Sequence, residues 1–344
     1  MTSALLEPRP EFGAAPALPQ FVQIEPVGQC NLRCQMCAIQ FRRDGPPHGP
    51  LAFMPFETFT GLVDAFPGLR ELHLQGLGEP TMHPRFFDMV AYATGRAIRV
   101  STNSNLTLWS ERRARLCIES GLAALSVSLD AADAAIFERI RKGAHFGKVL
   151  RNLRRVMAAR AAARSPMAVR IVMVLMKQNL ADLPNLVRLA AAEGVPEVFV
   201  QHLCHDFEER TLPSEYKPIR SFIHDETLDR AAPAFVEQTF AAARAAAQET
   251  GVRLRLPRLS GTPAPRPAPP RCDWPWRGSY ISYRGDAMPC CMVGTPDRAS
   301  FGNMARDGVQ AVWHNAAYRE FRERLASPEP PAICRSCSLY RGTF

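Results

Sequence analysis

The chain has 344 residues, of which 47% are hydrophobic and 22% charged, and this ordinary globular composition excludes wholesale disorder. The formal net charge of +9 permits an anionic partner, but the arginines alternate with acidic residues, so we expect no nucleic-acid binding. The sequence shows neither a signal-peptide pattern nor about 18 uninterrupted apolar residues. We therefore expect a cytoplasmic protein without a membrane partner.

Six apolar segments alternate with helical patterns between Phe21 and Gly251. Strands are predicted at 21–27, 70–76, 97–103, 122–130, 167–176 and 197–203. Helices are predicted at 54–66, 84–95, 109–120, 131–142, 146–163 and 180–193, and at 233–250 after an irregular charged loop. Strand-helix units in series imply a parallel sheet, so the expected fold is α/β, a partial (β/α)6 TIM-like barrel.

The active-site residues of such barrels lie at the carboxyl ends of their strands. Polar or cysteine-bearing segments follow each predicted strand: 28–37, GLGEP at 76–80, STNSN at 101–105, SLD at 128–130, KQN at 177–179 and HLCHD at 202–206. The sequence therefore predicts a site assembled from several strand ends.

A second composition begins after the barrel. Residues 255–271 are rich in proline, 278–293 read as a hairpin turning at the tripeptide RGD, and 307–327 read as one amphipathic helix. We expect an N-terminal extension at 1–20, a barrel at 21–251, a connector at 252–271 and a cysteine-rich module at 272–344. A module of about 70 residues buries too small a hydrophobic core to be stable alone, so we expect a cross-link such as a bound metal to stabilise it.

Three of the ten cysteines, Cys30, Cys34 and Cys37, form a C-x3-C-x2-C loop directly after the first predicted strand. Clustered cysteines in a reducing compartment indicate metal binding rather than disulfides. Zinc sites and iron-sulfur cubanes ordinarily take four ligands, so three thiolates leave one position open. The alternatives are a zinc site completed by a distant His or Cys, and three thiols that lie together by coincidence.

The loop resembles that of the radical S-adenosylmethionine (radical SAM) superfamily, and GLGEP resembles that family's Gly-Gly-Glu-Pro motif with Leu77 replacing the first glycine. The resemblance covers about residues 20–250. It implies a [4Fe-4S] cluster on Cys30, Cys34 and Cys37 whose open iron binds SAM. It also implies reductive cleavage of SAM to a 5'-deoxyadenosyl radical that abstracts a substrate hydrogen, with an electron donor such as flavodoxin or ferredoxin.

The same resemblance implies SAM-binding residues: Met36, Gly78, Glu79, Asn103, Ser128 and Arg141. Met36 takes the place of the usual aromatic residue and can pack on adenine. Gly78 and Glu79 would meet the SAM amine, and Arg141 its carboxylate. The alternatives are ordinary strand-end turns for Asn103 and Ser128, and an exposed helix end for Arg141.

The C-terminal cysteines form a second group, and a metal bound to them could stabilise the small module. They resemble the shortened SPASM, or twitch, extension, which implies an auxiliary [4Fe-4S] cluster on Cys272, Cys290, Cys334 and Cys337. Cys291 remains an alternate ligand, and zinc remains the alternative metal. Cys117 is expected to be a buried hydrophobic residue.

A polar segment follows the sixth predicted strand and carries His202, Cys204, His205 and Asp206. These residues are candidates for substrate contact or acid/base catalysis, because oxidising a carbon radical usually requires loss of a proton. The alternative is a polar loop with a capping aspartate.

The function favoured by the sequence is net oxidation of a small-molecule biosynthetic intermediate, with the auxiliary cluster as electron acceptor. Only about 20 residues precede the first predicted strand, too few for a leader-binding domain. The alternatives are a maturase that modifies a peptide or protein, and a non-catalytic iron-sulfur or zinc protein.

Overall fold

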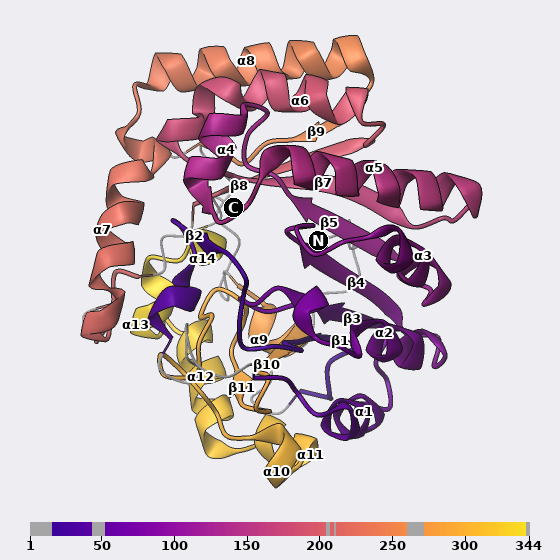
Figure 1. Cartoon of the computed structure of the whole chain (residues 1–344). Coiled ribbons are helices and arrows are strands. Elements are labelled where there is room, and N and C mark those ends of the chain that lie inside the picture. The colour runs from indigo at the N-terminus through magenta and orange to yellow at the C-terminus, as the bar shows by residue number, and fades with distance from the viewer. Residues whose placement is uncertain (1–15, 43–51, 204–206, 210, 260–271, 342–344) are drawn as a thin grey trace.

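A mostly parallel sheet forms the centre of the molecule in the computed structural model, which describes residues 16–42, 52–203, 207–209, 211–259 and 272–341 (Figure 1). Its middle contains β1 (Phe21–Ile24), β3 (Glu71–Leu74), β4 (Arg99–Ser104), β5 (Ala124–Ser128), β7 (Ala168–Leu175) and β8 (Glu197–His202), side by side in this order. Each of the six predicted strands is thereby confirmed. The α/β fold class is confirmed as well.

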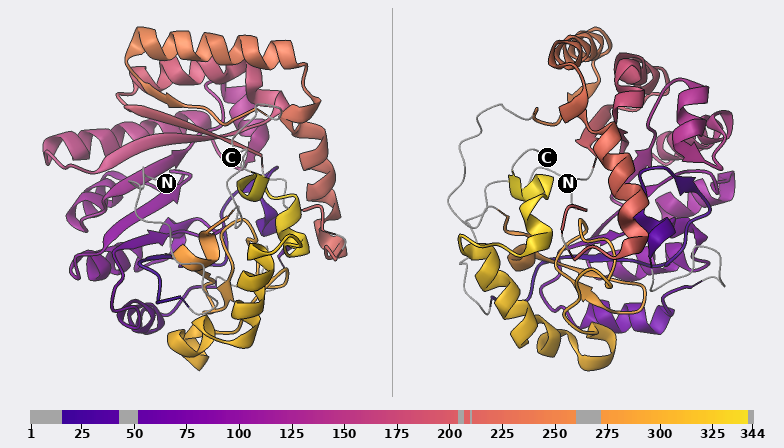
Figure 2. Two further views of the ribbon diagram at one scale, coloured as in Figure 1. Left: turned by 180° about the vertical axis from the view of Figure 1, so that it is seen from behind. Right: turned by 90° about the vertical axis from the view of Figure 1, so that its left-hand side faces the viewer.

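The helices lie on the outer side of the curved sheet (Figures 1 and 2). The predicted helices are present as α1 (Phe56–Asp64), α2 (Phe86–Thr94), α3 (Glu111–Glu119), α4 (Ala134–Ile140), α5 (Phe146–Ala162), α6 (Leu183–Ala192) and α8 (Pro233–Thr250). Outward strand residues such as Val100 and Val198 share one buried hydrophobic cluster with Phe59 and Phe240 of these helices. No helix in the described ranges is both long and apolar enough to cross a membrane.

Several local predictions are wrong. The predicted helix 131–142 ends at Ile140, and β6 (Arg141–Lys142) pairs antiparallel with β2 (Arg33–Cys34) of the cysteine loop. The charged loop after β8 contains α7 (Lys217–Glu226).

The predicted C-terminal helix 307–327 is also divided, into α11 (Val309–Trp313) and α12 (Ala316–Ala326). Asn315 caps α12 by accepting a hydrogen bond from the Tyr318 N–H, which starts a new helix there.

The C-terminal module joins the main sheet instead of forming one of its own. The predicted hairpin is present, with β10 (Gly278–Ile281) antiparallel to β11 (Ala287–Met288). Strand β10 also pairs parallel with β1, while β9 (Arg253–Arg255) extends the opposite edge beside β8. The two edge strands of the six-stranded middle, β1 and β8, therefore each have a further neighbour, and neither leaves an unpaired edge along the residues that pair.

Short elements complete the described chain: α9 (Trp274–Arg277), α10 (Met304–Asp307), α13 (Ala332–Arg335), α14 (Ser338–Arg341), and the 3-10 turns Ala38–Phe41, Pro80–Met82, Lys177–Asp182, Ser214–Tyr216 and Leu228–Arg230.

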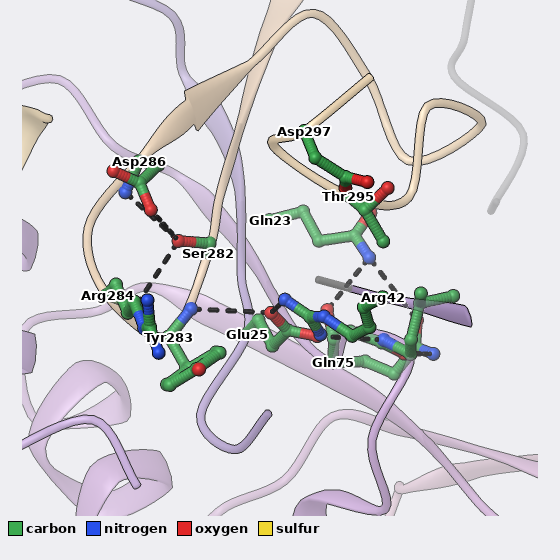
Figure 3. A network of polar contacts seen from close by, with 12 residues as sticks. Gln23, Glu25, Arg42, Gln75, Ser282, Tyr283, Arg284, Asp286, Thr295 and Asp297 are labelled. Carbon is green, nitrogen blue, oxygen red and sulfur yellow. Dashed lines mark hydrogen bonds and ion pairs between the residues drawn. The ribbon is translucent and has the colours of Figure 1, made fainter. Parts of the chain in front are cut away.

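A buried ion pair joins the module to the barrel (Figure 3). Arg42 donates to both carboxylate oxygens of Glu25, at 2.7 and 3.0 Å, and neither side chain is exposed. The backbone N–H groups of Leu77 and Tyr283 donate to the same carboxylate, at 3.1 and 3.4 Å. The pair therefore ties together the end of β1, the end of the cysteine loop, the GLGEP segment and the β10–β11 turn.

Breaking this pair should destabilise the protein strongly. We expect Glu25→Gln to lower the free energy of unfolding by about 3–5 kcal/mol, because it leaves a buried guanidinium without its counter-charge. Glu249→Gln removes the same charge from a pair with Arg188 that is more than half exposed, and should cost less than about 1 kcal/mol. Anaerobic urea unfolding measures both, and equal midpoints would contradict the anchoring role of Glu25.

Candidate functional site

The three-cysteine loop is held against the barrel by backbone pairing. Cys34 lies in β2 opposite Arg141, and the Cys37 N–H donates to the Cys34 carbonyl at 3.1 Å. Cys34 is buried, and Cys30 and Cys37 are half-buried. The loop thus places its three thiols at the carboxyl end of β1, as the sequence predicts.

Several donors point at the sulfur atoms. The Leu32 N–H and the Asn105 side-chain amide lie 3.4 and 3.8 Å from the Cys30 sulfur, and the Arg141 guanidinium lies 3.8 Å from the Cys34 sulfur. Donors in these positions favour thiolate over thiol.

Burial nevertheless raises the pKa of the Cys30 thiol, and the neighbouring charges of Glu79, Cys37 and Cys34 raise that pKa further. Burial likewise raises the pKa of Cys34, to about 12. The negative charges of the three thiolates therefore repel one another, and a bound cation such as iron would offset that repulsion. This donor set fits a cluster bound through three thiolates.

Glu79 is buried beside this loop, and its carboxylate connects two strand ends. The backbone N–H and hydroxyl of Thr81 and the Ser104 hydroxyl donate to Oε1, at 3.2, 2.6 and 2.8 Å. The Asn105 N–H donates to Oε2 at 2.8 Å. Burial raises the pKa of Glu79, and these hydrogen bonds oppose that rise. A carboxylate offers about four acceptor sites, two on each oxygen, so Oε2 keeps capacity for a further donor.

Gly78 allows two backbones to meet. A Cβ at this position would overlap the carbonyl oxygens of Val27 and Gln29, at the start of the cysteine loop. The following N–H, of Glu79, donates to the Gln29 carbonyl at 3.0 Å. Glycine is needed here for a close approach, and its predicted contact with the SAM amine remains a prediction.

The other predicted SAM-binding residues lie at neighbouring places. Met36 is half-buried and packs against the apolar cluster that contains Ile140, Met176 and Tyr216. Asn103 and Ser128 are half-buried near the ends of β4 and β5. The Asn103 side-chain oxygen is buried without a hydrogen-bond partner in the described part of the chain, so it can accept one from a ligand.

Arg141 is buried, so the alternative of an exposed helix end is wrong. Its Nε lies 2.7 Å from a carboxylate oxygen of fully buried Asp130, while another of its nitrogens reaches toward Cys34. Arg141 therefore contacts the cysteine loop directly.

Asn105 and Asp130 are site residues that the sequence analysis did not single out. Asn105 bonds to Glu79 and, through its side chain, reaches both Cys30 and Asn31. Asp130 accepts from the Val174 N–H at 2.9 Å and pairs with Arg141. Both belong to the strand-end segments STNSN and SLD, so their position was an available signal.

His202 does not extend the candidate site. Its Nε2 lies 2.6 Å from the Arg258 carbonyl, and its place in the alternation of β8 matches the outward-facing Val198 and Val200. Cys204, His205 and Asp206 lie outside the described residues. The catalytic role of these four residues stays a prediction.

The C-terminal cysteines gather around Cys290. Burial raises the pKa of the Cys290 thiol, and the charges of Cys291, Cys337, Cys272 and Cys334 raise it further. The hydroxyl of Ser336, between Cys334 and Cys337, is buried without a partner among the described residues. Four thiolates and an unused donor fit a second cluster, and Cys291, next to Cys290 in the chain, stays the alternate ligand.

Family models match both parts of the chain. The radical SAM superfamily model matches residues 24–190, and the SPASM model, described as an iron-sulfur cluster-binding domain, matches residues 272–338.

Similar proteins align with most of the chain. A tungsten-containing aldehyde ferredoxin oxidoreductase cofactor-modifying protein of Pyrococcus furiosus is 24% identical over 93% of this chain and 87% of its own. A PqqA peptide cyclase of Xanthomonas euvesicatoria is 26% identical over 93% and 80%. The crystal structure of Streptococcus suis SuiB bound to S-adenosylmethionine aligns with a TM-score of 0.68 at 15% identity, over 94% of this chain and 72% of SuiB. SuiB bound to its precursor peptide SuiA aligns with a TM-score of 0.63 at 14% identity, over 94% and 71%. At these identities the structures support the fold alone.

Gly78→Ala should disturb the cysteine loop. The added methyl forces the two backbones apart, at a cost of about 1–3 kcal/mol in unfolding free energy. The matched control is Gly61→Ala in α1, where a Cβ meets nothing within 4 Å and helix propensity predicts a gain of up to about 1 kcal/mol. Thermal unfolding of both variants tests this, and a neutral Gly78→Ala would contradict the close approach.

Cys34→Ala should remove one cluster and spare the other. Iron and sulfide analysis after anaerobic reconstitution should fall from about eight to about four irons per chain, because each cubane holds four. Cys117 is fully buried in the hydrophobic core, which confirms its predicted position. Cys117→Ala is therefore the control, and this variant should keep both clusters. Loss of all iron in Cys34→Ala would contradict two independent sites.

Proposed function

Because this chain belongs to the radical SAM superfamily and carries a SPASM domain at its C-terminus, we propose that it is an enzyme that oxidatively modifies a peptide. The observation that carries the proposal is the similarity, over more than nine tenths of the chain, to a PqqA peptide cyclase. The likeness in fold to SuiB, which was crystallised with a precursor peptide, agrees with it. A peptide substrate therefore has more support than the small molecule that the sequence analysis favoured.

Each residue group has a definite task in this proposal. Cys30, Cys34 and Cys37 would hold the SAM-binding cluster, and Cys272, Cys290, Cys334 and Cys337 the auxiliary one. When bound, these clusters and SAM supply a reducing electron, a hydrogen-abstracting radical and an electron acceptor.

The protein's own polar groups would orient SAM. Glu79 Oε2 has capacity for a further donor such as the SAM amine, and Asn103 offers a buried acceptor. Arg141, held by Asp130, presents its guanidinium beside the cysteine loop, within reach of a carboxylate bound there.

The second cysteine group supports net oxidation. A cluster ligated by four thiolates has no open iron, so electron transfer is its natural role. We therefore infer that the product has lost two hydrogens relative to the substrate, as in a crosslink or a dehydrogenation.

Modification of a small molecule is the second candidate. It is favoured by the similarity to the Pyrococcus furiosus protein, whose name describes modification of a cofactor.

Anaerobic turnover tests the proposal. The reconstituted protein is incubated with SAM, a strong reductant and short peptides encoded near its gene, and products are followed by mass spectrometry. We expect 5'-deoxyadenosine together with a peptide lighter by two hydrogens. A peptide of unchanged mass, as after epimerisation, would contradict oxidation, and modification of a small molecule alone would favour the second candidate. Cys34→Ala is the inactive control and Cys117→Ala the active one.

A further inference from the structure

The inner face of the barrel sheet is polar and partly open to solvent. Along β4, Val100, Thr102 and Ser104 are buried, whereas the alternating residues Arg99 and Asn103 are partly exposed. Strand β8 shows the same alternation. The buried residues of both strands include valines that belong to the same hydrophobic cluster as the helices, so these residues face outward. Successive residues of a strand point to opposite faces, so the partly exposed residues face the barrel interior.

Arg170 lies on this inner face, in β7, level with a predicted SAM-binding residue. The register places Asn103 opposite Ser126 and Ser126 opposite Arg170. The Arg170 Nε donates to the Ser126 hydroxyl at 2.9 Å, which fixes the guanidinium in this row. Two strand spacings put the Cα atoms of Arg170 and Asn103 about 10 Å apart.

Arg170 has charged neighbours of both signs. Burial lowers the pKa of Arg170, Glu197 opposes this shift, and the nearby charges of Arg255 and Arg99 lower the pKa further. The Glu197 carboxylate is bonded to Arg253 at 2.9 Å. Arg170 forms no ion pair with any described acidic residue. Holding a half-buried cation beside like charges costs free energy, and such costs are typical of functional sites.

An aromatic ring between two arginines shapes this region. The guanidinium groups of Arg170 and Arg255 lie over the ring of Phe199, at 5.4 and 5.5 Å from its centre. Stacking on a ring restrains the planar guanidinium fork. The terminal nitrogens of Arg170 donate to no acceptor in the described ranges, so they are available to a ligand.

We propose that Arg170 and Arg255, on either side of Phe199, form a substrate subsite that binds a carboxylate, supplied by an aspartate or glutamate side chain of the peptide. The guanidinium fork matches a carboxylate bidentately, and the ligand supplies a counter-charge that Arg170 does not receive from an ion pair with any described acidic residue. The identity of the substrate as a peptide rests on the proposed function, whereas the carboxylate subsite rests on the contacts of Arg170.

Paired peptide pools test the subsite. Acetylated and amidated octapeptides, random except for a central Glu in one pool and Gln in the other, are passed over the immobilised holoenzyme and the retained peptides are quantified. We expect about tenfold preferential retention of the Glu pool, in the range of a charge-assisted bidentate pair. Arg170→Gln should abolish the preference, and Arg170→Lys should restore part of it.

Matched control variants distinguish binding of the Glu pool at the subsite from its attraction by the net positive charge of the protein. Arg188→Gln removes one exposed arginine and should keep the preference. Arg255→Gln alters an exposed side chain and should weaken the preference even if Arg170→Gln fails to fold. Equal retention of both pools by the wild-type protein would overturn the proposal.

Calorimetry with glutarate, a small dicarboxylate, distinguishes the two proposals. Glutarate binding that is lost in Arg170→Gln, without retention of either pool, supports the subsite and contradicts a peptide substrate. Retention of both pools alike, without glutarate binding, supports a peptide substrate and overturns the subsite.

Discussion

The buried pair of Glu25 and Arg42 is the interaction on which the rest of the structure depends. Two charges without access to water persist only when hydrogen bonds surround them. Glu25 receives these from Arg42, Leu77 and Tyr283, so the carboxylate is satisfied only when three distant segments are in place. The same constraint explains Gly76, where any Cβ would overlap the Glu25 side chain. The cysteine loop and the C-terminal module are therefore coupled through one carboxylate.

The site balances the negative charge of three sulfurs by a comparable arrangement. Arg141 reaches Cys34 while Asp130 holds the guanidinium, and Asn105 reaches Cys30 while Glu79 holds its backbone. In each case the group beside sulfur is oriented by a buried carboxylate from a neighbouring strand end. The acidic groups thus position the donors, and the donors stabilise the thiolates.

The sequence predicted what local pattern and spacing determine. The apolar runs located the six strands, and the C-x3-C-x2-C spacing located the cysteine loop. The pairing of Cys34 with Arg141 escaped prediction, because a two-residue ladder joins segments more than a hundred residues apart and leaves no periodic trace. The partnership of Glu25 and Arg42 escaped for a similar reason, since each looks like an ordinary surface charge in sequence. Arg141 illustrates the limit: its SAM-binding role stays a prediction, and neither its strand nor its partner Asp130 was predicted.

The parallel pairing of β10 with β1 determines the order in which the molecule can be completed. Tyr283 donates to Glu25 across 258 residues of sequence, so the first strand emerges from the ribosome long before its outer neighbour exists. At about 5–20 residues per second, this edge stays unpaired for roughly 10–50 s during synthesis. A bare strand edge is a template for aggregation. The chain therefore has a period of vulnerability that ends only when its last quarter is made, and iron insertion before that point would meet an unfinished site.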